Sequence, residues 1–322
     1  NPSSALSIST LVSKKLHIFI VLDRISPSDY KLYSRIDGLD ITDTASAPVD
    51  IIQYFEKTNK NSSNAVATHN EFLKQLVVTF VGAGGGSGNT TIAMETGIAL
   101  STQYRNKGNG RVAFLDLDLS GGPVCDYLNI EARLDMNEIS VNPNRLDSYM
   151  LEIMSAKHMS GMDVFSSKSI YQSPKSNQSN IALLSLLNCV VDNYNVTIID
   201  MPNRSPIDCS EILRNSDIIF VTGIFSVPSA KRIKKETQSL LNLGIEKSRI
   251  RILITDTDTN ILGKISQRFN IDSVFKGYNI SYIRRDRAFA LECADSGVSM
   301  LLTEPKRGIC KDIVEISEEI MK

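Results

Sequence analysis

The chain has 322 residues, 42% of them apolar, and a formal net charge of −1, which suits one large or two medium globular domains. A charge so close to neutral does not indicate a dominant polyanionic partner such as nucleic acid, although a local basic patch stays compatible with it. Five cysteines without a CxxC pair argue against a disulfide framework or a zinc knuckle and favour reduced thiols in a cytosol.

The hydropathy pattern does not indicate a membrane protein. No apolar run reaches the roughly 18–20 residues that a membrane span needs, and no signal peptide is visible. We therefore expect a cytoplasmic protein, with a targeting segment ahead of Asn1 left open.

The first sixty residues have the pattern of a small α/β module. Their periodicity predicts strands and helices in the order βαβα, at 16–22, 28–35, 39–44 and 50–57. A polar stretch follows this module. We therefore place the module at 1–60, a linker at 61–74 and a separate domain at 75–322.

Beyond the linker, apolar strands alternate with helices. A strand at 76–81 leads through a glycine-rich loop into a helix at 90–103, and a second strand spans 111–117. Further strands are predicted at 195–199, 218–222, 250–255 and 279–283. This alternation predicts an α/β fold, a doubly wound and mostly parallel sheet with helices on both faces.

The glycine-rich loop keeps part of the phosphate-loop pattern G-x-x-x-x-G-K-[ST]. Gly88 and Thr90 match that pattern, but Ala83 stands at its first glycine and Asn89 at its lysine. Glycines let backbone N–H groups face phosphate oxygens, and a helix N-terminus adds partial positive charge. A glycine-rich turn without a ligand is the alternative for this loop alone.

Carboxylates stand at the ends of two other strands. Asp116 and Asp118 end the strand at 111–117, and Asp200 ends the strand that begins at Asn195. Ligands of open parallel sheets bind beyond the carboxyl ends of the strands, so these acids and the loop should meet at one edge. Their combination predicts a magnesium–phosphate site.

These residues resemble the deviant Walker A family of ParA and MinD ATPases. The family's loop, K-G-G-x-G-K-T-[ST], corresponds to Gly84-Gly-Gly-Ser-Gly-Asn-Thr-Thr91. Its D-x-D strand end matches Leu115-Asp-Leu-Asp118, and its Walker B strand, ending in D-x-P, matches Ile199-Asp-Met-Pro202. The resemblance covers residues 75–305. It implies a P-loop fold of the ParA/MinD type, ATP and Mg²⁺ as ligands, and a homodimer formed around the nucleotide.

The resemblance also implies a role for each matching position. Asp118 would orient the attacking water, while Thr90, Asp200 (through water) and Asp116 would form the magnesium site. The phosphates would lie in a cradle made by Gly84, Gly85, Gly86, Ser87, Gly88 and Asn89, with Thr91 at the α-phosphate. At the base end, Thr255 replaces the family's asparagine, and Arg284 and Asp286 belong to an altered I-P-x-D segment, so base specificity is in question.

Within this family the chain looks most like the TadZ/CpaE branch of type IVb (Tad) pilus assembly. Phe114–Leu119 followed by Gly122–Leu128 looks like that branch's D-L-D-L…G-D-V…Y-L segment. The branch varies the loop lysine and carries a receiver-like domain before the ATPase-like one. It implies pilus-assembly proteins as partners and a place at a cell pole. Residues 1–60 would then be an incomplete receiver-like module without a phosphoacceptor; a plain βαβα cap is the alternative.

Both lysines of the family's loop are missing. In the family, the first, at the position of Gly84, reaches across the dimer, and the second, at the position of Asn89, binds the β- and γ-phosphates. Phosphoryl transfer depends on neutralising charge on the γ-oxygens, so we expect slow or absent hydrolysis, with Arg284 or Arg285 as candidate substitutes. Two alternatives stay open: an active ParA/MinD-type ATPase for partition or division-site placement, and a pseudo-ATPase that binds no nucleotide.

Two further segments bear on partners. The C-terminal stretch from Asp312 to Lys322 is amphipathic with an acidic polar face, so we expect it to pack on the core and not on an anionic membrane. Lys231-Arg-Ile-Lys-Lys235 is the strongest basic cluster. We interpret it as a solvated helix face, with DNA binding as the less favoured alternative.

Overall fold

The computed structural model describes residues 18–22, 39–43, 75–108, 110–119, 122–141, 146–168, 176–202, 208–257 and 271–322. The chain divides into two units, Asn1–Leu73 and Lys74–Lys322. In the first unit, β1 (Ile18–Leu22) pairs in parallel with β2 (Leu39–Asp43). The helices predicted at 28–35 and 50–57 and the linker at 61–74 lie outside the described residues.

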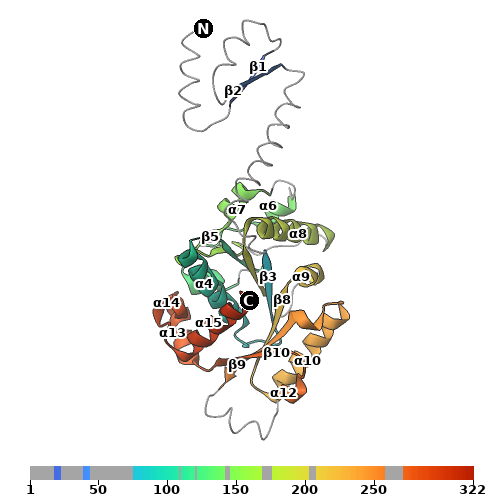
Figure 1. Cartoon of the computed structure of the whole chain (residues 1–322), viewed down its shortest axis with the longest axis vertical. Coiled ribbons are helices and arrows are strands. Elements are labelled where there is room, and N and C mark those ends of the chain that lie inside the picture. The colour runs from blue at the N-terminus through green and yellow to red at the C-terminus, as the bar shows by residue number, and fades with distance from the viewer. Residues whose placement is uncertain are drawn as a thin grey trace. The chain divides into compact units, whose positions relative to one another are not determined.

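The second unit is built on an eight-stranded sheet with the strand order β10-β9-β8-β3-β7-β4-β6-β5 (Figure 1). Its strands are β3 (Leu76–Gly82), β4 (Val112–Asp116), β5 (Ala156–Lys157), β6 (Asp163–Phe165), β7 (Val196–Met201), β8 (Ile218–Ile224), β9 (Ile250–Thr257) and β10 (Asn279–Arg284). Every neighbouring pair is parallel except β5 and β6 at one edge. The predicted doubly wound, mostly parallel sheet is therefore confirmed, and the β5–β6 edge pair is an addition that the sequence pattern did not indicate.

Helices cover both faces of this sheet (Figure 1). They are α4 (Asn89–Lys107), α5 (Val124–Leu128), α6 (Met136–Val141), α7 (Ser148–Met154), α8 (Ser176–Asn193), α9 (Ser210–Asn215), α10 (Val227–Asn242), α12 (Ile271–Val274), α13 (Arg287–Ser296), α14 (Met300–Thr303) and α15 (Gly308–Ile320), with a short 3-10 helix, η2 (Lys247–Arg249). Because side chains alternate along a strand, β3 sends Val78 and Phe80 to one core and Val77 and Val81 to the other. The α4 and α15 side chains join the first core, and those of α8 and α10 join the second.

The C-terminal helix α15 packs on the core, as the sequence predicted. Ile313, Ile316 and Ile320 are buried in the same apolar cluster as residues of α4. Asp312, on the same helix, is also buried and pairs with Arg284 at the end of β10. Among the helices in the described ranges, none combines the length and apolarity that crossing a bilayer requires.

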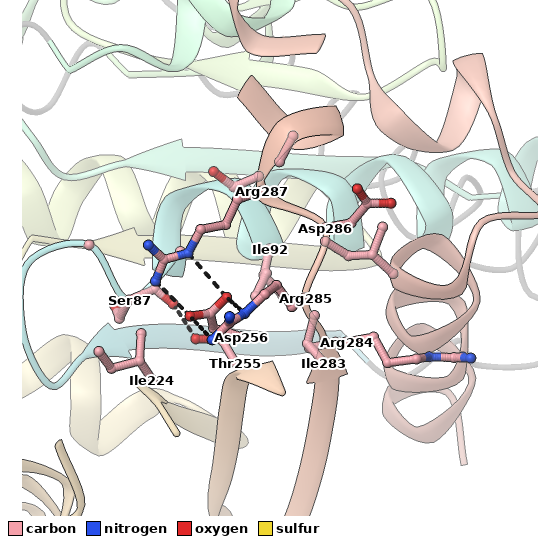
Figure 2. Close-up of a pocket in the computed structure, with 15 residues that line it drawn as sticks. Ser87, Ile92, Ile224, Thr255, Asp256, Ile283, Arg284, Arg285, Asp286 and Arg287 are labelled. Carbon is pink, nitrogen blue, oxygen red and sulfur yellow. Dashed lines mark hydrogen bonds and ion pairs between the residues drawn. The ribbon is translucent and has the colours of Figure 1, made fainter. Parts of the chain in front are cut away.

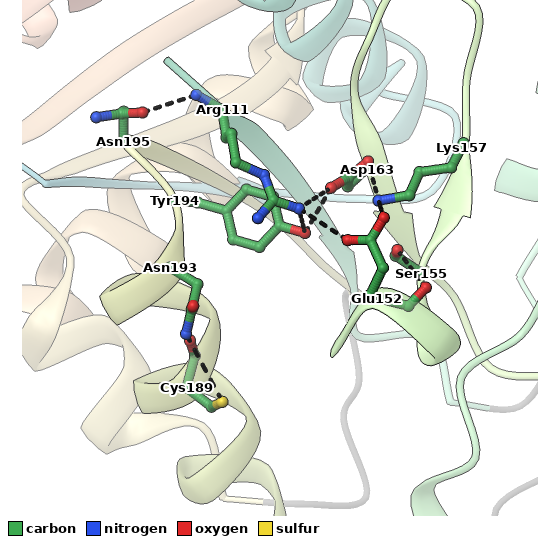
Figure 3. Close-up of polar contacts among 9 residues, drawn as sticks. All are labelled: Arg111, Glu152, Ser155, Lys157, Asp163, Cys189, Asn193, Tyr194 and Asn195. Atoms are coloured by element: carbon green, nitrogen blue, oxygen red, sulfur yellow. Dashed lines mark hydrogen bonds and ion pairs between the residues drawn. The ribbon is translucent and has the colours of Figure 1, made fainter. Parts of the chain in front are cut away.

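A polar network holds the sheet at the edge where the parallel strands begin (Figure 3). The Tyr194 hydroxyl donates to Asp163 Oδ2 at 2.6 Å, and the Arg111 guanidinium donates to the same oxygen at 2.8 Å. Lys157 and Glu152 extend the network, because Lys157 Nζ lies 2.9 Å from a carboxylate oxygen of Glu152 and 2.9 Å from one of Asp163. This network joins the starts of β4, β6 and β7 at the edge opposite the strand ends where the candidate site lies.

Candidate phosphate-binding site

The loop between β3 and α4 has the backbone of an anion cradle. Gly86 and Gly88 have φ angles of 71° and 75°, a left-handed conformation that glycine adopts without strain. A Cβ placed on Gly85 or Gly86 would meet no atom within 4 Å, so this side of the loop is open. Gly88 caps the 19-residue helix α4 without a side-chain hydrogen bond, and no acidic residue stands in the first turn. The amide end of α4 is therefore open to an anion.

Two neighbouring strands hold the loop in place. Ala83 donates its backbone N–H to the Thr222 carbonyl on β8 at 2.8 Å. The Thr255 hydroxyl on β9 donates to the Ser87 carbonyl at 2.8 Å and lies 3.4 Å from the Gly223 carbonyl. The Thr255 hydroxyl therefore positions the loop, a contact that the sequence did not indicate. The resemblance alone had placed this residue at the base.

Asn89, at the lysine position, turns its amide nitrogen inward. Its Nδ2 donates to Asp200 Oδ1 at 2.7 Å and to the Phe80 carbonyl at 3.2 Å. The side chain is buried, and its Oδ1 has no hydrogen-bond partner among the described residues. A buried acceptor of this kind fits a cation or a bound water, and it does not fit a phosphate oxygen, which is also an acceptor.

The strand-end acids lie together, as predicted. Asp116 on β4 stands directly opposite Asp200 on β7 in the strand register. Asp116 Oδ1 accepts from the Asp118 backbone N–H and Oδ2 accepts from the Ser166 hydroxyl, both at 2.9 Å. A Cβ on Gly122 would lie 2.9 Å from Asp116 Oδ2, so the chain after β4 can pass this close only with glycine there.

Burial dominates the electrostatics of this acidic cluster. It raises the pKa of Asp116 to about 7, and the neighbouring carboxylates of Asp200 and Asp118 add to the rise. Burial likewise raises the pKa of Asp200 to about 6, against hydrogen bonds from Thr90 and Asn89 that favour its ionised form. A cation bound here would offset the desolvation of these carboxylates.

The residues present fit a magnesium ion held together with phosphate. Magnesium in phosphate sites usually takes one or two protein oxygens and fills its other positions with water and phosphate oxygens. Thr90 and Asp200 can supply those protein oxygens, and Thr90 lies close enough to Asp200 to favour the ionised form of its carboxyl. Within the described ranges, no group of three His, Cys, Asp or Glu side chains could hold a metal by itself. Asp116 already accepts from protein donors at both oxygens, which favours a role in shaping the turn after β4.

A cavity of about 110 Å³ opens beside the loop (Figure 2). It is lined by Gly86, Ser87, Gly88, Thr91, Ile92, Ile224, Thr255, Asp256, Ile283, Arg284, Arg285, Asp286, Arg287, Ala290 and Ile309. Four of the lining residues were singled out for nucleotide contacts at the base end or at the α-phosphate: Thr91, Thr255, Arg284 and Asp286. The structure therefore gathers these four positions around one hollow.

Three arginines around this cavity are paired with carboxylates, and Figure 2 shows the pairs that Arg285 and Arg287 form with Asp256. Asp256, with φ of 61°, accepts from Arg285 Nε at 2.8 Å and from Arg287 at 2.6 Å. The Arg284 guanidinium binds Asp312 on α15, with Nε 2.9 Å from Oδ1. Arg284 and Arg285 are the candidate substitutes for the missing lysines. Both guanidinium groups are ion-paired with aspartates, and neither is hydrogen-bonded to the loop.

The residue that the sequence reasoning missed is Arg232. We interpreted the basic cluster around it as a solvated face of a helix. In the structure, a Cβ placed on Gly84 would lie 2.8 Å from Arg232 Nε and 3.2 Å from its Cζ. The guanidinium therefore lies against the first residue of the cradle. Nothing in the local sequence pattern connects the two positions, since they belong to different elements far apart in the chain.

Similar solved structures share this fold. A ParA family ATPase from Chlorobium tepidum TLS superposes with a TM-score of 0.61 and 27% identity, covering 76% of this chain and 99% of that one. The septum site-determining protein MinD complexed with Mg-ADP, from Pyrococcus horikoshii OT3, gives 0.58 and 13% over 76% and 95%. A putative plasmid partition protein from Borrelia burgdorferi B31, bound to AMPPNP, gives 0.55 and 16% over 76% and 97%.

No model of a protein family matches the chain, and no curated protein matches it either. The solved structures establish the architecture: residues of the second unit adopt the P-loop fold of the ParA/MinD type, as the sequence predicted. The receiver-like assignment of the first unit stays a prediction.

Proposed function

We propose that this protein is a nucleotide-binding member of the ParA/MinD superfamily that holds ATP and Mg²⁺ and hydrolyses ATP slowly or not at all. One observation carries the proposal. Asn89 sends a neutral amide to Asp200 at the position where the family's lysine supplies positive charge, while the backbone cradle around it is kept.

Nucleotide binding is supported by what the site retains. The open loop, the uncapped amide end of α4 and the pair of Thr90 and Asp200 are the parts that contact phosphate and magnesium in such a fold. Two solved structures of the same fold carry Mg-ADP and AMPPNP. ATP with Mg²⁺ is therefore the ligand we propose.

Slow hydrolysis is supported by what the site lacks. Loss of one preorganised donor to developing charge slows catalysis by about 10²–10³-fold in other enzymes. In this chain Gly84 stands at the first lysine position of the loop and Asn89 at the second. Asp118, at the edge of the site, is the residue we propose for orienting any attacking water.

For the cellular role we propose positioning of a type IVb (Tad) pilus, as in the TadZ/CpaE branch. The segment from Phe114 to Leu128 supports this branch, and a protein that keeps its nucleotide suits a stationary marker better than a cycling switch. We further propose a homodimer around the nucleotide, pilus-assembly proteins as partners, and a location at a cell pole.

The biochemical test is a pair of measurements on the purified chain with Mg²⁺. Calorimetric titration is expected to show ATP binding, and a multiple-turnover assay is expected to show little phosphate release. Rapid turnover that Asp118→Ala abolishes would overturn slow hydrolysis and favour an active ATPase. Absence of ATP binding would overturn the proposal and favour the alternative hypothesis, a pseudo-ATPase that binds no nucleotide.

The cellular test separates pilus assembly from partition or division-site placement. Deleting the gene is expected to remove surface pili and to leave plasmid retention and septum position unchanged. Loss of plasmids or misplaced septa with normal pili would favour the alternative, a role like those of the partition and MinD proteins that share the fold.

A further inference from the structure

We propose that Arg232, carried on helix α10, is a phosphate-binding cation beside this loop and takes over, from within the same chain, the binding role of the lysine that is missing at Gly84. This inference rests on the proposed nucleotide binding and names one residue of this chain that would bind the phosphates there. It also places a binding residue in a basic segment that the sequence alone assigns to solvent.

The first argument is the space at Gly84. Gly86 and Gly88 need glycine for their positive φ angles, but Gly84 is not among the positive-φ residues, so its backbone does not require glycine. What its missing side chain provides is room, because a Cβ there would lie 2.8 Å from Arg232 Nε and 3.3 Å from one of its terminal nitrogens. A lysine side chain at position 84 would start in the space that the Arg232 guanidinium occupies, so the glycine at 84 makes room for Arg232.

The second argument is that α10 is held close to the sheet. Ser226 caps the helix by accepting from the Ser229 backbone N–H, and Ile233, next to Arg232, is fully buried. On β8, a Cβ at Gly223 would lie 2.6 Å from Ser229 Oγ and 2.7 Å from Ile233 Cδ1. This close packing brings the first turns of α10 against the strand next to β3, which fixes the backbone from which Arg232 reaches the loop.

The third argument is charge. Among the residues that the structure describes, no carboxylate pairs with Arg232, whereas Arg284, Arg285 and Arg287 each bind an aspartate. The cradle from Gly84 to Thr91 contains no acidic residue. A guanidinium presents a planar set of N–H donors that matches phosphate oxygens, so an exposed arginine at this point suits an anion.

The position of Gly84 in the loop indicates which phosphates of the nucleotide Arg232 would contact. Thr91, at the α4 end of the loop, is the residue expected beside the α-phosphate. Gly84 lies at the opposite end of the cradle, next to β3, so Arg232 faces the terminal phosphates. Its contribution should therefore appear with ATP and be small with AMP.

The test compares ATP, ADP and AMP binding to the full chain by calorimetry in the presence of Mg²⁺. Arg232→Ala is expected to weaken ATP binding by about tenfold or more, the worth of one charge-assisted hydrogen bond, and to leave AMP nearly unchanged. Lys231→Ala and Lys235→Ala, which remove exposed charges on the same helix, are the matched controls and should leave ATP binding as it is. Thermal unfolding of each variant checks that the fold is intact.

A second pair of variants tests the shared space. Gly84→Ala is expected to displace the guanidinium and weaken ATP binding in the unaltered background. In the Arg232→Ala background the same change should have little further effect.

The outcomes separate this inference from the proposed function. No ATP binding by the unaltered chain overturns both. ATP binding that Arg232→Ala leaves unchanged, or that Lys235→Ala weakens equally, overturns the role of Arg232 alone.

Discussion

The side chain of Asn89 is hydrogen-bonded to Asp200 over 2.7 Å, although the two residues stand 111 positions apart in the chain. The amide thus joins the first turn of α4 to the end of β7, in the centre of the candidate site. This hydrogen bond links the two elements, but the amide is neutral and adds no positive charge to the cradle.

Restoring a cation at this position should restore hydrolysis. Asn89→Lys is expected to raise the single-turnover rate of ATP hydrolysis by about 10²-fold, since one preorganised donor is worth that much in other enzymes. Radiolabelled ATP with excess protein measures the step directly. Asn89→Gln, which stays neutral, is the control, and an equal rise in both variants would contradict the electrostatic explanation.

The loop anchor on β9 can be tested with a matched pair of threonines. Thr255→Val removes the bond to the Ser87 carbonyl, while Thr257→Val removes a bond of the same length, 2.8 Å, to the Ile283 carbonyl. Each change is expected to lower the free energy of unfolding by about 1 kcal/mol. Only Thr255→Val should also weaken ATP binding, because only that hydroxyl holds the cradle. Equal affinities in the two variants would argue against the anchor.

Stability should depend on pH through Glu95. This carboxyl is buried in α4, and burial raises its pKa above 4.5 despite hydrogen bonds from Ser299 and the backbone of Met300 and Leu301. Above pH 4.5 the unfolded chain releases this proton while the folded chain retains it. The contribution of protonated Glu95 to the free energy of unfolding is therefore fully present below pH 4.5. It is lost as pH rises through the raised pKa of Glu95 in the folded protein.

Urea unfolding at a series of pH values measures this effect. The difference in unfolding free energy between the unaltered chain and Glu95→Gln is expected to shift against the unaltered chain as pH rises from 4.5, and then to level off. A difference that stays constant over pH would show that Glu95 titrates as an ordinary carboxyl.

The network at the opposite edge of the sheet should affect stability alone. Tyr194→Phe removes the hydroxyl that donates to Asp163 at 2.6 Å, and a hydrogen bond to a charged group is worth about 1.5–3 kcal/mol. We expect unfolding in urea to show a loss of this size, with unchanged calorimetric affinity for ATP. Weakened ATP binding in this variant would mean that the two edges of the sheet are coupled.

Much of the fold follows from local patterns. The predicted strand at 76–81 and helix at 90–103 correspond to β3 and α4, and the carboxylates of Asp116 and Asp200 lie opposite each other as the parallel sheet requires. These features depend on apolar runs and on chain order, which the sequence carries directly. The strands β5 and β6, of two and three residues, are too short to leave such a pattern.

The chemistry of the site was less accessible from the sequence. The sequence showed that Asn89 occupies the position of a phosphate-binding lysine. It did not indicate that the Asn89 amide donates a hydrogen bond to Asp200. It offered Arg284 as a substitute cation, which the structure pairs with Asp312. Side-chain pairing of this kind depends on which acid is nearest in space, and local periodicity does not encode that distance.

The sequence by itself determined the glycine-rich loop, the acids at the strand ends and the absence of lysine from that loop, because each is a matter of residue type along one short segment. Only the tertiary structure decided that the Thr255 hydroxyl holds the loop and that Arg232 lies against Gly84. These contacts join strands and helices distant in the chain. They exist because the packing of β9 and α10 around β3 brings those side chains to the cradle.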